Sequence, residues 1–136
     1  MSCSSAIYMV GTNQTVAPNG QIPLGSIVRR FGKNVALQGS DIVICGAGYY
    51  DVEVSTTLSP VTAGEIGVQL YLDGTPVPGA FQYGTGTAGG ALPLSFHALV
   101  RLGCCDNAAS LSLRLDSLAA TTGATVDNVG VVVEKI

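Results

Sequence analysis

The sequence predicts an all-β protein, a jelly-roll β-sandwich of about eight to ten antiparallel strands. The first observation is a series of segments in which apolar and polar residues alternate with a period of two, the pattern of a strand with one buried face. The second is the recurrence of Gly, Pro, Asn and Asp clusters about every eight to twelve residues, the spacing of turns in all-β sandwiches. Thirdly, no segment of helical length repeats its apolar residues with a 3.6-residue period.

The segment 48–55, GYYDVEVS, is predicted to be the central strand of the sandwich. After Gly48, the side chains of Tyr50, Val52 and Val54 share one face, and the residues between them share the other. Aromatic and β-branched residues favour such a half-buried pleated surface. We therefore expect Tyr50 to lie in the core of a strand that continues to residue 58.

The part of the chain before this strand predicts shorter and less regular elements. Residues 11–21, rich in Gly, Asn and Pro, are expected to form a loop. Pro23 and Gly25 restrict the next segment to an irregular or edge strand. The strands expected in this part are 6–10, 22–31, 35–37 and 42–45.

After the central strand, the strongest local signal is the dipeptide Asp73-Gly74, which predicts a two-residue hairpin turn. The stretch 84–90 matches the spacing G-x-G-x-x-G. A strand, and not a helix, is expected after it, so we predict a glycine-rich loop and no dinucleotide site. The strands expected in this part are 65–72, 77–83, 92–102, 111–115 and 129–133.

The composition predicts one domain, 1–136, with an unusually uncharged surface. Charged residues make up 11% of the 136 residues and hydrophobic residues 47%, whereas about a quarter of an average chain is charged. We expect part of the surface to be buried against copies of the chain; the alternative is a monomer coated with Ser, Thr, Asn and Gln. The net charge of −3 argues against nucleic-acid binding. No apolar run is long enough to span a membrane, and the first residues lack a secretory signal pattern, so we expect synthesis in a cytosol.

The sequence contains no convincing catalytic, cofactor or metal site. The one histidine, His97, lies within a strand opposite the apolar row, and no G-x-S-x-G turn accompanies it, so a surface or interface role is expected. None of the four cysteines has C-x-x-C spacing. Cys3 and Cys45 are predicted to be packed thiols. Cys104 and Cys105 are predicted to be accessible thiols, or, if their turn lies near a threefold axis, an intersubunit disulfide or adventitious metal site.

Five segments occur in the order found in a known group of proteins. They are GAGYYDVEVS, GVQLYLDGTPVPGA, LSFHALVRL, SLSLRLDSL and NVGVVVEKI, and they span residues 46–136. The chain thereby resembles the tumour necrosis factor-like (TNF-like) and complement-globular-head superfamily of trimeric jelly rolls. Within it, MSCSSAIYMV and VVVEKI resemble small structural proteins of Firmicutes bacteriophages, with the heads of spore-surface filament glycoproteins as a related group. The collagen-like stalk and the acidic calcium cluster of some relatives are missing, so no metal site is carried over.

The resemblance implies a non-enzymatic virion structural protein, a homotrimeric capsid decoration or head-fibre protein on a phage particle. It would be made in the bacterial cytoplasm and would bind capsid or other virion proteins. The alternative is a receptor- or glycan-binding adhesin tip of a phage tail fibre or spore filament. Residues 1–21 are a candidate anchoring arm. The candidate trimer interface is one strand face that stays apolar where that of a monomer would be polar, and it consists of Tyr49, Tyr71, Leu99 and Val132.

A cluster of basic residues is the candidate partner-binding site. Arg29, Arg30 and Lys33 are three of the six Lys and Arg residues and lie within five positions. Such a cluster on an acidic chain would suit an acidic partner. A solvated turn is the simpler interpretation, and the sequence leaves both open.

Overall fold

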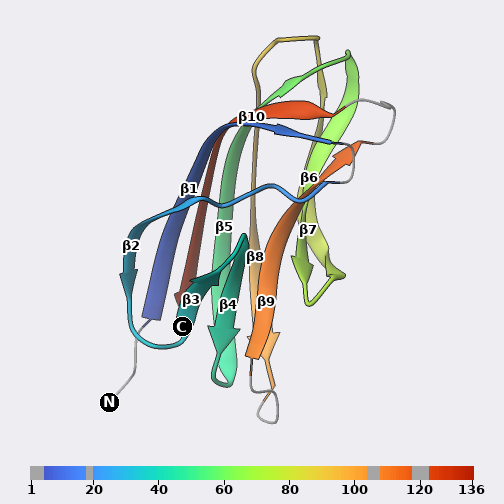
Figure 1. The fold of residues 1–136 in the computed structure, drawn as a ribbon. Coiled ribbons are helices and arrows are strands. Elements are labelled where there is room, and N and C mark those ends of the chain that lie inside the picture. Colours follow the sequence, from blue (N-terminus) through green and yellow to red (C-terminus); the bar gives the residue numbers. More distant parts are fainter. Residues whose placement is uncertain (1–4, 18–19, 104–107, 118–122) are drawn as a thin grey trace.

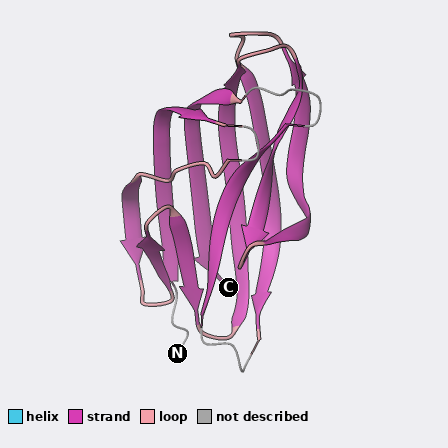
Figure 2. Cartoon of the chain, turned by 45° about the vertical axis from the view of Figure 1, so that its right-hand side comes forward, coloured by secondary structure: helices cyan, strands magenta, loops and turns pink. Residues whose placement is uncertain are grey.

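The computed structural model describes residues 5–17, 20–103, 108–117 and 123–136, and these residues form two facing antiparallel sheets of five strands each. Figures 1 and 2 show the two layers, with loops at both ends of the sandwich. The described residues contain no helix, and thus none that could cross a membrane. The predicted all-β fold is confirmed.

The first sheet, called sheet A, contains the longest strand, β5. Its order is β2-β1-β10-β5-β8. The strands are β1 (Ser5–Val16), β2 (Ser26–Phe31), β5 (Gly48–Pro60), β8 (Leu92–Leu102) and β10 (Ala124–Lys135). The segment predicted to be central, now β5, pairs with β10 on one side and with β8 on the other.

The second sheet, called sheet B, has the order β3-β4-β9-β6-β7. The chain crosses repeatedly from one sheet to the other, as a jelly roll requires. The strands are β3 (Val35–Gln38), β4 (Asp41–Cys45), β6 (Gly64–Leu72), β7 (Thr75–Gly86) and β9 (Ala108–Ser117).

The core lies between the sheets and is built from alternate residues of facing strands. On β5, Tyr50, Val52 and Val54 are buried, as the period of two predicted. On β9, Leu111 and Leu113 are buried in the same hydrophobic cluster. Each large apolar side chain removed from water contributes about 1.5–3 kcal/mol to folding, so this shared layer is the main stabilising contact between the sheets.

Two predicted loops are wrong in part. Strand β1 continues through the expected loop 11–21 as far as Val16, because β10 offers pairing partners along its whole length. Asn13 has φ 50° and is skipped in the pairing, but the register between β1 and β10 is the same on both sides of it, so the polar, turn-like residues interrupt the ladder only locally. Strand β7 similarly extends into the glycine-rich stretch, where Thr85 pairs with Glu65 of β6.

The position of β1 also bears on the candidate anchoring arm, 1–21. Ser5–Val16 is paired with β10, and its first half, from Ala6 to Val10, is also paired with β2. This part of the segment is therefore built into the sheet. An anchoring role for the segment stays a prediction.

Candidate functional site

The outer face of sheet A is hollowed because a row of small residues crosses three neighbouring strands. Gly130 on β10 lies opposite Ser55 on β5, and Ser55 lies opposite Ser95 on β8. Tyr8 and His97 stand at the two ends of the adjacent row and help to line a groove of about 440 Å³. We call this groove the first hollow.

Gly130 gives the first hollow its depth. A Cβ atom built on Gly130 would have the Tyr8 ring carbon Cε1 as its nearest neighbour, at 3.6 Å, which is ordinary van der Waals contact. The fold therefore does not require glycine here for steric reasons. The missing side chain leaves room above the strand that another surface could fill.

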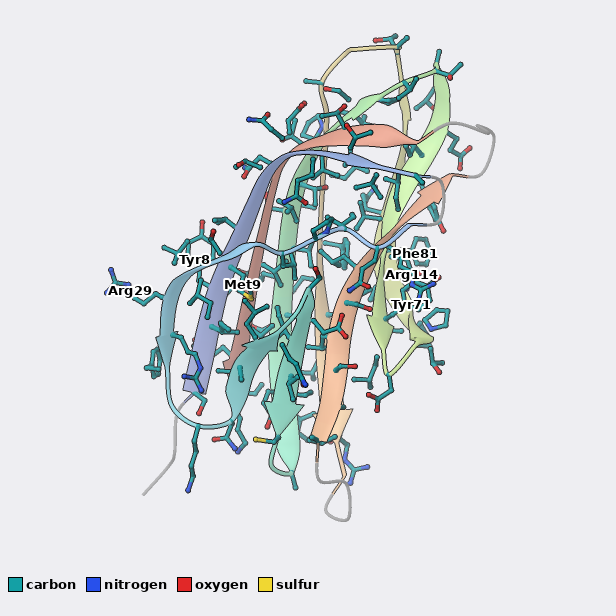
Figure 3. All side chains as sticks on the ribbon, viewed as in Figure 1. Tyr8, Met9, Arg29, Tyr71, Phe81 and Arg114 are labelled. Carbon is teal, nitrogen blue, oxygen red and sulfur yellow. The ribbon has the colours of Figure 1, made fainter. Side chains whose placement is uncertain are left out.

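A second hollow, of about 260 Å³, lies over β1 and β2 on the same face. Its floor includes Ala6, which is paired with Phe31 on β2. Tyr8 borders both hollows, and Figure 3 shows its side chain on the β1 side of the sandwich near Arg29. The face thus offers two adjoining depressions separated by one exposed aromatic ring.

Charged side chains occupy the β5 side of this face. Asp51 is the cross-strand partner of Glu134, and Glu53 is the partner of His97. The His97 ring nitrogen Nε2 pairs with the Asp51 carboxylate, and their side chains are 61% and 34% exposed. The hydrogen bonds of the described residues join His97 to Asp51 and to no serine, so a Ser-His-Asp relay is not assembled here.

Comparison with known proteins yields similarity at the level of structure only. No family model and no curated protein matches the sequence. Murine APRIL, a TNF-like protein, superposes with a TM-score of 0.73 at 10% identity, over 98% of this chain and 99% of that one. The globular domain of zebrafish complement 1qA gives a TM-score of 0.69 at 8% identity, over 100% and 97%. The chain has the TNF-like jelly-roll fold. The phage PRD1 vertex protein P5 also superposes on this TNF-like jelly roll, with a TM-score of 0.60 at 15% identity, over 100% of this chain and 99% of that one.

The structure divides the residues predicted to form the trimer interface of this TNF-like jelly roll. Tyr49, Leu99 and Val132 lie on the outer face of sheet A, and Tyr49 and Leu99 are 48% and 58% exposed. Tyr71 lies on β6 in sheet B, where the guanidinium carbon of Arg114 is 4.9 Å from its ring centroid. The expectation of one shared face is therefore wrong for Tyr71, because alternation within a strand does not say which sheet the strand joins.

The predicted basic cluster lies at the β2 edge of the fold but does not form a single surface. Arg29 pairs with Tyr8 and lines the second hollow on the outer side. The side chain of the next residue, Arg30, lies on the opposite face of β2. Its Nε donates a hydrogen bond to the carbonyl oxygen of Val35 on β3, at 2.7 Å. Lys33 follows in the turn between β2 and β3. Arg30 thus links the two sheets, and the other two cations have no such structural bond among the contacts of the described residues.

Cys45 is half-buried and has a free thiol, whose Sγ donates to the carbonyl oxygen of Lys33 at 3.3 Å. It is less enclosed than the packed thiol predicted from sequence. Cys3, Cys104 and Cys105 lie outside the described residues. Within the described ranges, no group of three or more His, Cys, Asp or Glu side chains is arranged to hold a metal ion.

The outer face of sheet B carries aromatic side chains, the feature most relevant to the adhesin alternative. Phe81 and Tyr83 on β7 have ring centroids 5.0 Å apart with an interplanar angle of 50°. Figure 3 shows Tyr71, Phe81 and Arg114 on the side of the molecule opposite Tyr8. Both outer faces bear aromatic rings, but on sheet B two of them, Phe81 and Tyr83, lie in contact with each other.

Sequence reasoning missed the small residues that create the first hollow. Gly130, Ser55 and Ser95 each stand at positions of predicted strands whose side chains alternate away from the core. This alternation could have identified them as residues of an outer face. They come from three distant segments, however, and only the register of β10, β5 and β8 places them in one row.

Proposed function

We propose that the chain is a non-enzymatic structural protein that forms a homotrimer and is displayed on the surface of a bacteriophage particle, as a capsid decoration or head-fibre protein. The observation that carries this proposal is the outer face of sheet A, with its two hollows of largely apolar lining. In this proposal the protein is made in the bacterial cytoplasm and needs no cofactor. Its partners are copies of itself and capsid or other virion proteins.

Self-association is supported by where the exposed apolar side chains lie. Most of the large ones belong to strands of sheet A, and obligate interfaces are of this apolar kind. Of these, Tyr8, Phe31, Tyr49 and Leu99 lie on the outer face, whereas Ile27 and Val28 lie along the free edge of β2. A chain with so few charged residues gains by burying such a face.

The arrangement of this face favours a ring of copies. Leu99 projects from β8 at one edge of sheet A, whereas the second hollow lies over β1 and β2 toward the other edge. A projection and a hollow at different places on one molecule suit a head-to-tail contact, which closes into a ring when the rotation permits. The number of copies, three, follows from the resemblance of the sequence to trimeric jelly rolls.

The virion role is supported by the similarity to the PRD1 vertex protein, which extends over nearly the whole of both chains. A compact all-β domain without cofactors is also suited to persist outside a cell. Localisation on the virion surface is part of the proposal.

Filling the first hollow tests the assembly. Gly130→Arg should leave the monomer folded, because the new Cβ meets only ordinary contacts, and should prevent association through the face. Thr85→Arg makes the same charge change on an exposed position of sheet B and serves as the matched control. By light scattering at micromolar concentration, wild type and Thr85→Arg should give about 41 kDa, three times 13.8 kDa, and Gly130→Arg about one third of that. A wild-type monomer, or an intact Gly130→Arg trimer, would refute assembly through this face.

The virion role is tested by mixing the purified protein with particles that lack it. We expect binding to a fixed number of sites per particle. No binding to particles together with binding to bacterial cells would favour the adhesin.

The adhesin, bound to a receptor or host-surface glycan, is a second candidate because of the aromatic rings on sheet B. Aromatic side chains present large amphipathic surfaces at binding sites, and Tyr71, Phe81 and Tyr83 lie on the face that the trimer would leave outward. Phe81→Ala should abolish cell binding if this candidate is correct, and should leave particle binding unchanged if it is not.

A further inference from the structure

The free edge of sheet A, strand β2, has main-chain groups and the side chains of Ile27 and Val28 that burial of the outer face of the sheet does not account for. Among the strands of the described residues, β2 has a neighbour in its sheet on one side only, β1. All six residues of Ser26–Phe31 are exposed, and Figure 1 shows the strand at the margin of the molecule. An edge strand presents unpaired N–H and C=O groups to any extended chain that can lie alongside it.

This edge is the basic end of an acidic molecule. Residues 1–40 contain three basic and no acidic residues, a charge of +3, whereas residues 41–136 contain three basic and nine acidic residues, a charge of −6. Arg29 stands on the outer side of β2, beside Tyr8, and Arg30 stands on the inner side, bonded to Val35. A strand added here would therefore meet one guanidinium group on each of its two faces.

The same charges select against a second copy of this chain. A copy of β2 laid against the edge would bring two more arginines next to Arg29 and Arg30, and like charges on neighbouring strands are destabilising. An acidic strand would instead be attracted. Ile27 and Val28, which are 44% and 51% exposed, offer apolar contact along the same edge.

We propose that β2 accepts an extended, acidic segment of a partner protein as an added strand of sheet A, with acidic residues at two adjacent positions. Adjacent residues of a strand point to opposite faces, so two neighbouring carboxylates match Arg29 and Arg30. Main-chain hydrogen bonds supply the affinity of such strand addition, and the side chains supply its specificity. The inference rests on the proposed virion role for the source of the segment, a particle protein.

The test uses a defined peptide and the full chain. The probe is the acetylated and amidated octapeptide Thr-Val-Thr-Glu-Glu-Thr-Val-Thr. One control peptide has Lys in place of both Glu, and another keeps the charge but has its central amides N-methylated, which removes the N–H donors. In a ¹⁵N–¹H titration, the probe should shift and protect the amides of residues 26–31, whereas neither control peptide should do so.

Two protein variants carry the same charge change at opposite edges of sheet A. Arg29→Glu should weaken peptide binding at least about tenfold, because it places like charges together at the interface. Arg101→Glu on β8 should change it less than about twofold. Arg29 is preferred to Arg30 because the Arg30 side chain also bonds Val35, and its loss would disturb the fold.

The outcomes separate this inference from the proposed function. Any one of four results would overturn strand addition. The N-methylated peptide could bind as tightly as the probe, or the two protein variants could weaken probe binding equally. The probe could shift amides outside residues 26–31, or it could fail to bind. If the protein still binds particles in that case, the virion role is supported and does not depend on strand addition. If the probe binds β2 as expected but the protein does not bind particles, strand addition at β2 is supported and the virion role is refuted.

Discussion

The hydroxyl group of Tyr50 lies 2.7 Å from the carbonyl oxygen of Cys45 and donates a hydrogen bond to it. The carbonyl oxygen of Gly46 is also 2.7 Å from this hydroxyl, and the Asn34 amide nitrogen Nδ2 donates a hydrogen bond to the carbonyl oxygen of Cys45, at 2.6 Å. Tyr50 is fully buried on β5. One side chain of sheet A thus holds the crossover from β4, in sheet B, into β5.

Replacing Tyr50 separates the packing contribution of the ring from the hydrogen bonds of its hydroxyl. Tyr50→Ala should lower the free energy of unfolding by about 3–5 kcal/mol, as other large aromatic truncations do in cores. Tyr50→Phe should lower it by about 1–2 kcal/mol, because the Gly46 carbonyl loses this buried donor. Chemical denaturation at one fixed protein concentration measures both. A Tyr50→Phe variant as stable as wild type would mean that the hydroxyl does not secure the crossover.

The stability of the protein should fall at alkaline pH through the same residue. Burial, and secondarily the charge of Cys45, raise the pKa of Tyr50 above 10.0, while the hydrogen bond with Asn34 opposes this. The folded state therefore keeps the Tyr50 proton at a pH where the unfolded chain loses it. Its contribution to stability is fully present below the unfolded pKa and is lost as pH rises toward the folded pKa. Unfolding free energies should decline above about pH 10, and more steeply for wild type than for Tyr50→Phe. Parallel pH profiles would contradict this assignment.

Gly67 is required by a neighbouring ring and not by its backbone conformation. A Cβ atom at Gly67 would lie 2.1 Å from Cδ1 of Tyr83 and 2.6 Å from the carbonyl oxygen of Gln82. Gly67→Ala should therefore cost about 1–3 kcal/mol, the usual penalty of overpacking. Gly25→Ala is the control, because its Cβ would meet no atom closer than 3.9 Å, and it should be neutral or stabilise by up to about 1 kcal/mol. The midpoint temperature of thermal unfolding should fall for Gly67→Ala and should rise or stay unchanged for Gly25→Ala.

His97 is expected to contribute little to the stability of the monomer. Its pair with Asp51 is largely exposed, and such surface pairs contribute about 0–1 kcal/mol. His97→Ala should thus unfold within about 1 kcal/mol of wild type and lose no measurable function. A hydrolytic activity that disappears in the His97→Ala protein would overturn the non-enzymatic interpretation.

Local patterns predicted most of the strands correctly, and the hairpin shows why. Asp73 and Gly74 have φ values of 51° and 80°, and Leu72 pairs with Thr75 across them. Both the turn and the strands beside it depend on residues within a few positions of one another. The burial of Tyr50, Val52 and Val54 followed from the same kind of local alternation.

The candidate site depended on information that no local pattern contains. Tyr71 alternates as regularly as Tyr49, yet it lies on the other sheet. Gly130, Ser55 and Ser95 form the first hollow only because β10, β5 and β8 pair in one particular register.

The sequence by itself determined that the chain forms strands, where most of them lie, which side chains alternate toward a core, and that the strands suit a jelly roll. The tertiary structure alone decided the continuation of β1 to Val16, the sheet to which each strand belongs, the hollows of sheet A and the division of Arg29 from Arg30 across the β2 edge. The physical reason is the range of the interactions. Alternation and turns reflect the conformation of neighbouring residues, whereas sheet order and register arise from hydrogen bonds and packing between segments far apart in the chain.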